Sequence, residues 1–266
     1  MATAPVFEER KISVGRVFQR AFSAIGNNPV VVLGLAVLVG ALPSLLMTYL
    51  FVQLGLTSPE AIQSGAVSPT GFGAAIFISS VIGMVVAALV QASLTRAVVS
   101  ANEGRRVTFG ESLSAGFRMI LPLIALSILF AIGVGIGFML LLIPGIILLL
   151  MWAVAIPVLV IERPGVIASF GRSAELTKGS RWKILGLFLV LFISYWLLTV
   201  VVGLVGLGMY GATSGAGGLT VANLLGSVIA GTVFNILWGT IQPSLYVELR
   251  QAKEGLAVED LQDVFA

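Results

Sequence analysis

Two long stretches of this 266-residue chain contain no charged side chain. The first covers the 43 positions 119–161, and the second covers the 64 positions 184–247. A helix that crosses the hydrocarbon core of a bilayer needs about 20 apolar residues, so each stretch holds two spans. Residues 29–54 and 73–95 each supply one more apolar segment. The sequence therefore predicts an all-α, polytopic membrane protein with about six transmembrane helices.

The turn between the third and fourth of these spans is predicted from a proline–glycine pair. Ile143-Pro144-Gly145 is typical of a helix stop followed by a tight turn. A turn at this place leaves only about 16 apolar residues before Glu162, fewer than a full span requires. We therefore expect the fourth helix to be short.

The positions of the basic side chains predict the orientation. Lysine and arginine are retained on the cytoplasmic side of a membrane, and all 15 of them fall in four segments that six spans place on one side. We therefore expect a multi-pass protein of a bacterial-type cell inner (plasma) membrane, with both termini in the cytoplasm. Three domains follow: a cytoplasmic amphipathic segment over 1–28, a six-helix transmembrane domain over 29–247, and an acidic amphipathic cytoplasmic tail over 248–266.

Three cytoplasmic segments have the pattern of amphipathic helices that lie in the membrane interface. The first covers about 14–25. The second begins at Thr108, where Glu111 completes a capping-box pattern, and the third runs from about 165 to 178, with Gly179 as its stop. Each precedes a pair of spans, so the chain is predicted to contain three repeated units. Coincidence in a sequence rich in leucine and glycine is the alternative.

Two of the predicted spans carry small and amide side chains at intervals of about four residues. Such spacing places them on one helix face, where small residues allow close approach and amides bond across the interface. A helix-packing seam is the first interpretation, and a polar groove for a lipid head group or a solute is the second. The candidate residues are Gly83, Gln91, Gly231, Asn235 and Gln242.

Several chemistries are excluded or made improbable by composition. The chain contains no cysteine and no histidine, which removes thiolate chemistry and the commonest general base and metal ligand. No charged residue lies inside a predicted span, whereas ion-coupled pumps usually retain one. Carboxylates of the cytoplasmic segments are expected to pair with nearby basic side chains. The carboxylates in question are Glu103, Glu111, Glu162 and Glu175. We expect no enzymatic activity, no metal site, no cofactor and no nucleic-acid partner.

Membrane lipids are the expected partners of the cytoplasmic segments. Each basic side chain adds about 1 kcal/mol of attraction near an anionic leaflet, and interfacial tryptophan anchors a span at the head-group level. The candidate contacts with anionic head groups are Arg16, Arg20, Arg172, Arg181, Trp182 and Lys183. The acidic tail over 248–266 is expected to be solvated or packed on the surface, with docking of a protein partner as the alternative.

The segment from Arg172 to Lys183 reads RSAELTKGSRWK and resembles the "RS-x-ELT-x-G-x-x-W" motif of a group of uncharacterised bacterial membrane proteins. That group includes the membrane domain attached to some glycerophosphoryl diester phosphodiesterases and the YciC-like inner-membrane proteins. IPGI at 143–146 and LYVELR at 245–250 are similar to other stretches of it. The phosphodiesterase chemistry of the larger relatives resides in a separate soluble domain, so the resemblance implies a lipid-related setting and no catalytic activity.

These patterns favour a non-enzymatic membrane protein that organises or handles lipids, or that scaffolds envelope partners. The alternative is a permease or channel for a small neutral or amphipathic solute, which would use the polar faces of the second and sixth spans. The two hypotheses differ in the role of Gln91, Asn235 and Gln242. Apolar replacement of these amides should abolish flux in a permease and leave a lipid-handling protein competent.

Overall fold

The computed structural model describes residues 12–53, 69–105, 107–212 and 216–254. Within these ranges the chain is helical, without strands. Six helices of the described residues are long and apolar enough to cross a membrane, which fits the predicted all-α, multi-pass membrane class. The spans are Pro29–Met47, Gly71–Asn102, Ile120–Leu140, Leu142–Ile161, Arg181–Val205 and Val228–Glu254.

The order of the elements follows the predicted three units, each a short helix before a pair of spans. In the first unit, α1 (Val14–Asn27) precedes one span built from α2 (Pro29–Gly34), η1 (Leu35–Ala41) and α3 (Leu42–Gln53), and then α5 (Pro69–Asn102). In the second, α6 (Phe109–Arg118) precedes α7 (Ile120–Leu140) and the paired α8 (Leu142–Met151) and α9 (Ala155–Ile161). In the third, α10 (Val166–Thr177) precedes α11 (Arg181–Ala212) and α12 (Ala216–Glu254).

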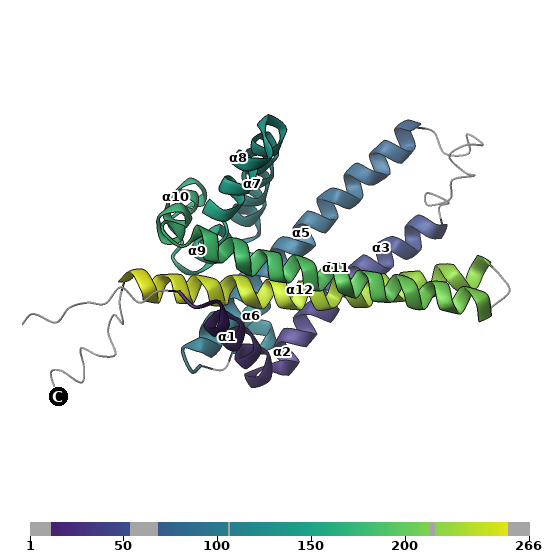
Figure 1. The fold of residues 1–266 in the computed structure, drawn as a ribbon, viewed down its shortest axis with the longest axis horizontal. Coiled ribbons are helices and arrows are strands. Elements are labelled where there is room, and N and C mark those ends of the chain that lie inside the picture. Colours follow the sequence, from purple (N-terminus) through teal and green to yellow (C-terminus); the bar gives the residue numbers. More distant parts are fainter. Residues whose placement is uncertain (1–11, 54–68, 106, 213–215, 255–266) are drawn as a thin grey trace, which may run out of the picture.

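The three pairs of spans diverge from a common base. Figure 1 shows α11 and α12 side by side, whereas α5 and the α7–α8 hairpin leave the same region in other directions. The three short helices α1, α6 and α10 surround this region. We call it the basic end, because the segments that contain the lysines and arginines meet there.

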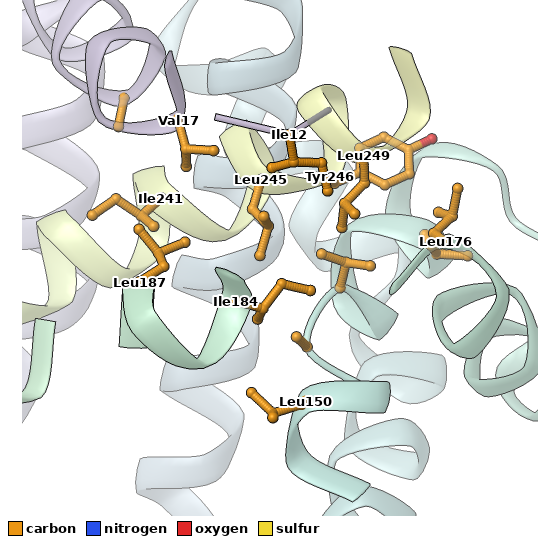
Figure 2. Packing of buried hydrophobic residues seen from close by; sticks show 14 of the residues in the cluster. Ile12, Val17, Leu150, Leu176, Ile184, Leu187, Ile241, Leu245, Tyr246 and Leu249 are labelled. Atoms are coloured by element: carbon orange, nitrogen blue, oxygen red, sulfur yellow. The ribbon is translucent and has the colours of Figure 1, made fainter. Parts of the chain in front are cut away.

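The largest buried cluster lies at the basic end and joins all three units (Figure 2). Its centre is the second half of α12, whose apolar residues recur at spacings of three and four and therefore lie on one face. The apolar face of α1 packs onto this face through Val17 and Ala21. The short helices are thus fixed to the spans by packing. The central members of the cluster are Ile12, Val17, Leu150, Leu176, Ile184, Leu187, Ile241, Leu245, Tyr246 and Leu249.

Away from the basic end, the spans expose large apolar side chains. Along α11, the residues Leu189, Phe192 and Trp196 are all exposed. A water-soluble protein rarely leaves such continuous apolar surface uncovered, whereas a helix in a bilayer satisfies its backbone internally and presents apolar side chains to lipid. The outer portions of the spans therefore have lipid as their solvent.

The predicted ends of the short helices are confirmed. Thr108 caps α6 through a complete capping box with Glu111, whose backbone N–H donates to the Thr108 hydroxyl at 3.3 Å. Gly179 follows the end of α10 with φ of +84°, a left-handed conformation that glycine adopts without steric cost. These local signals place α6 and α10 as short helices in front of their spans.

The predicted turn at Ile143-Pro144-Gly145 is wrong. α7 ends at Leu140, Leu141 is extended, and α8 already begins at Leu142. Proline is tolerated in the first helical turn because the N–H groups there have no intrahelical acceptor. Gly145 is instead a packing residue, since a Cβ on Gly137 of α7 would lie 2.9 Å from its Cα.

The fourth span is longer than predicted. It covers the 20 residues Leu142–Ile161, because α9 continues its path after a turn at 152–154. The predicted domain boundary after residue 247 falls inside α12, which continues as helix to Glu254. Residues 1–11, 54–68, 106, 213–215 and the tail beyond 254 lie outside the described residues.

Candidate lipid-contact site

The structure places Arg16 and Arg20, two of the predicted head-group contacts, against a carboxylate of α12. Glu248 lies on the buried face of α12 with its side chain 4% exposed. Its oxygens lie 2.6 Å from Nη2 of Arg16 and 3.4 Å from Nη2 of Arg20, and the backbone N–H of Ser13 donates to Oε1 at 3.3 Å. These contacts join α1 to α12 and engage the charges of both arginines within the protein.

Arg172, another predicted contact, is engaged in the same way. Its guanidinium donates to Glu162 Oε2 at 3.0 Å and to Glu175 Oε2 at 3.2 Å, and it also pairs with Glu254 at the end of α12. Although burial opposes the charged form, the hydrogen bonds to these three carboxylates raise the pKa of Arg172 above its ordinary value. The Tyr246 hydroxyl donates to Glu162 Oε1 at 2.9 Å, so the Arg172–Glu162 ion pair is hydrogen-bonded to α12.

The four predicted carboxylates therefore have internal roles. Glu162 and Glu175 bind Arg172, and Glu103 pairs with Arg105 at 2.5 Å, which confirms the expected ion pairing for these three. Glu111 instead accepts the backbone N–H of Thr108 at 2.7 Å. That bond is the largest cause of the lowered pKa of Glu111, and the hydrogen bond from the Thr108 hydroxyl is the second.

The remaining predicted contacts lie where α10 turns into α11. Lys183 donates from Nζ to the backbone oxygen of Ile12 at 3.0 Å, so it too serves an internal contact. Arg181 differs, because among the described residues it makes no ion pair and its buried Nε has no hydrogen-bond acceptor. Trp182 is 86% exposed and Lys178 is exposed. We call Lys178, Arg181 and Trp182 the α10–α11 corner.

Trp182 begins the lipid-facing side of α11. Residues seven, eleven and fourteen positions later, namely Leu189, Ile193 and Trp196, lie on the same helix face and are all exposed apolar side chains. The corner therefore combines two basic side chains with an aromatic ring at the first turn of a span. This is the arrangement that membrane boundaries favour.

The predicted seam between the second and sixth spans is present at its inner end. Nε2 of Gln91 donates to Oε1 of Gln242 at 2.8 Å, and both side chains are 8% exposed. A Cβ on Gly239 would lie 2.4 Å from Leu94 Cδ1, so α12 and α5 pack closely next to this bond. These two glutamines therefore join helices, as the packing interpretation predicts.

Gly83, Gly231 and Asn235 lie farther along the same helices and border open space. Two neighbouring cavities of about 380 and 160 Å³ separate the first span from α5 and α12. Asn235 and Gly40 of η1 border both. The larger cavity is lined by Gly40, Pro43, Met47, Ser79, Ile82, Gly83, Val86, Ala87, Val90 and Asn235; the smaller by Ala36, Gly40, Ala41, Val228, Gly231, Thr232 and Asn235.

Sequence reasoning missed Glu248 and Lys178. Glu248 was assigned to an acidic tail, but Ile241, Ser244, Glu248 and Ala252 recur at helical spacing on the inward face of α12. That periodicity signals a buried carboxylate that requires basic partners. Lys178 is not among the predicted head-group contacts. The structure shows that the predicted contact Lys183 bonds internally to Ile12.

Comparisons with known proteins do not add to this geometry. No family model, no curated protein and no solved structure matches the chain. Within the described part of the chain, no cluster of acidic side chains has the composition of a metal site.

Proposed function

We propose that this chain is a non-enzymatic integral membrane protein that handles lipids by binding anionic head groups at the α10–α11 corner. The observation that carries this proposal is that two basic side chains without a carboxylate partner in the described structure adjoin the exposed Trp182 at the first turn of a span. Arg16, Arg20 and Arg172 are engaged by carboxylates, whereas Lys178 and Arg181 have no carboxylate partner in the described structure.

The corner has the features that a head-group contact requires. A phosphate carried by a lipid beside α11 would meet the ammonium of Lys178 and the guanidinium of Arg181, which donates several hydrogen bonds in a fixed geometry. Trp182 would hold the span at the head-group level. Two basic groups near an anionic surface contribute about 2 kcal/mol, or about 30-fold in affinity.

The proposed location follows from the same residues. The basic end lies on the cytoplasmic side of a bacterial-type inner membrane, since lysine and arginine are retained there and the cytoplasmic leaflet supplies anionic head groups. Both termini are then cytoplasmic. The paired arginines Arg16, Arg20 and Arg172 hold α1 and α10 against α12. The corner, which has no carboxylate partner among the described residues, is left to meet lipid.

The transport alternative has less support. Gln91 donates its amide N–H to the Gln242 amide oxygen inside a packed seam, so this pair joins two helices and does not line a path for solute. Of the three amides which that hypothesis requires, Asn235 alone borders the two described cavities.

Mass spectrometry of lipids retained by the purified protein tests the proposal. The variant Lys178→Gln/Arg181→Gln is compared with the unsubstituted protein. The matched control, Arg105→Gln/Lys253→Gln, removes the same charge from two exposed positions of the same end. Protein is extracted from membranes of known lipid composition, and the ratio of anionic to zwitterionic lipid is measured for each sample.

The proposal predicts enrichment of anionic lipid in the unsubstituted protein and in the control, and loss of most of that enrichment in the corner variant. Equal enrichment in all three proteins would refute the corner as the site. Absence of enrichment in the unsubstituted protein would refute anionic lipid handling altogether.

A further inference from the structure

The cavities between the first span, α5 and α12 form a candidate binding site that is separate from the α10–α11 corner. We propose that they bind an uncharged, hydroxyl-bearing lipid, which enters from the membrane and donates a hydrogen bond to Asn235. This site lies away from the basic end, near the middle of the spans Pro29–Met47 and Gly71–Asn102. Its test does not depend on the head-group contact.

The size and lining of the larger cavity suit an apolar chain. Its volume of about 380 Å³ lies within the range of small-molecule sites in proteins. Apolar side chains such as Met47, Ile82 and Val86 supply most of the described wall. None of the described lining residues carries a charge, and a charged group at this depth would cost several kcal/mol. The portion of the ligand that enters is therefore uncharged.

The polar groups of the cavities indicate a hydrogen-bond donor on the ligand. The hydroxyls of Ser79 and Thr232 already donate to the backbone oxygens of Ile76 and Val228, at 2.9 and 2.7 Å. Each hydroxyl has one proton, so both retain only the ability to accept.

Asn235 is the strongest sign of a ligand. It is exposed on a membrane span, and its Nδ2 donates to the backbone oxygen of Gly231 at 2.9 Å. Among the described residues, nothing donates to its Oδ1. An amide oxygen without a partner in hydrocarbon is costly, and a lipid hydroxyl would satisfy it. The adjoining η1 is a π-helical segment, and such segments are frequent at functional sites.

The experiment uses a photoactivatable diacylglycerol in liposomes that contain the full-length protein. Labelled peptides are identified by mass spectrometry, with unlabelled dioleoylglycerol or its O-methyl ether as competitor. The ether retains both acyl chains and lacks the hydroxyl proton. The variant Gly83→Leu places a larger side chain in the wall of the larger cavity, where an added Cβ meets no atom within 4 Å. Gly135→Leu on α7 is the control, since its Cβ is equally free and it borders neither cavity.

The proposal predicts labelling of α3, α5 and α12 that dioleoylglycerol suppresses at least 5-fold more effectively than its ether. Gly83→Leu and Asn235→Leu should each lower this labelling at least 5-fold, and Gly135→Leu should leave it unchanged. Labelling spread evenly over all lipid-facing helices, or unchanged in both cavity variants, would overturn the site. Equal competition by the ether would overturn the hydroxyl-bearing class. Neither result affects the enrichment of anionic lipid at the corner.

Discussion

At the scale of single residues, the position of Glu248 explains how the protein uses its arginines. A carboxylate buried at the end of a span requires partners, because an unpaired charge there would cost several kcal/mol. Arg16 and Arg20 reach it from α1, which lies more than 220 positions earlier in the sequence. Two arginines that a membrane-surface pattern assigns to lipid are thus structural.

This arrangement predicts that removing the two arginines alone destabilises the protein more than removing the arginines together with the charge of Glu248. Arg16→Gln/Arg20→Gln leaves Glu248 buried without a cation and should destabilise the protein by about 3–5 kcal/mol. Adding Glu248→Gln removes the unpaired charge and should restore part of that loss. Thermal unfolding in detergent measures both effects, with the exposed Glu175→Gln as control. If the triple variant is no more stable than the double, the pairing does not hold α1 in place.

At the scale of elements, neighbouring residues in the sequence determine where a helix begins and ends, whereas contacts with other helices determine how it packs. Thr108 and Gly179 determine where α6 begins and where α10 ends, and both were predictable from a few neighbouring residues. The place of Gly145 depended on Gly137 in the preceding helix. The proline–glycine pair that usually marks a turn lies in the first turn of α8, where proline is tolerated.

The α6 cap carries a prediction that depends on pH. Thr108→Ala removes the hydroxyl that accepts from Glu111 and should cost about 1 kcal/mol of helix stability, so the amides of α6 should exchange faster with deuterium. Glu111 has a lowered pKa in the folded protein. Its contribution is therefore complete above the unfolded-state pKa and is lost as the pH falls through the folded-state value.

Exchange rates corrected for the intrinsic effect of pH provide the measurement. The difference between the unsubstituted protein and Thr108→Ala should shrink in acid, and the amides of α10, which has no such cap, serve as reference. A difference that stays constant through the acid range would show that the Glu111 carboxylate does not support the cap.

At the scale of the whole molecule, the sequence predicts far more of the fold than of the site. Six spans and three short helices follow from charge-free stretches and helical spacing, because the bilayer imposes length and polarity along the chain. The site depends on which charges meet in space. Arg172 and Arg181 are nine positions apart and chemically alike, yet among the described residues only the first has carboxylates around it.

The predicted orientation is also a property of the whole molecule. The native chain has no cysteine, so single cysteines at Ser64 and Ser214, both outside the described residues, report on one position each. Six spans with a cytoplasmic N-terminus predict that membrane-impermeant thiol reagents label both from the outside only. Labelling of either position from the cytoplasmic side would require a different number of spans.

Quenching of Trp182 fluorescence by brominated lipid reports whether the α10–α11 corner binds anionic lipid. The other three tryptophans are replaced by phenylalanine, and the protein is placed in liposomes with brominated anionic or brominated zwitterionic lipid at equal mole fraction. We predict stronger quenching by the anionic lipid, reduced to equality by Lys178→Gln/Arg181→Gln and retained in Arg105→Gln/Lys253→Gln. Equal quenching by both lipids in the parent protein would contradict the account.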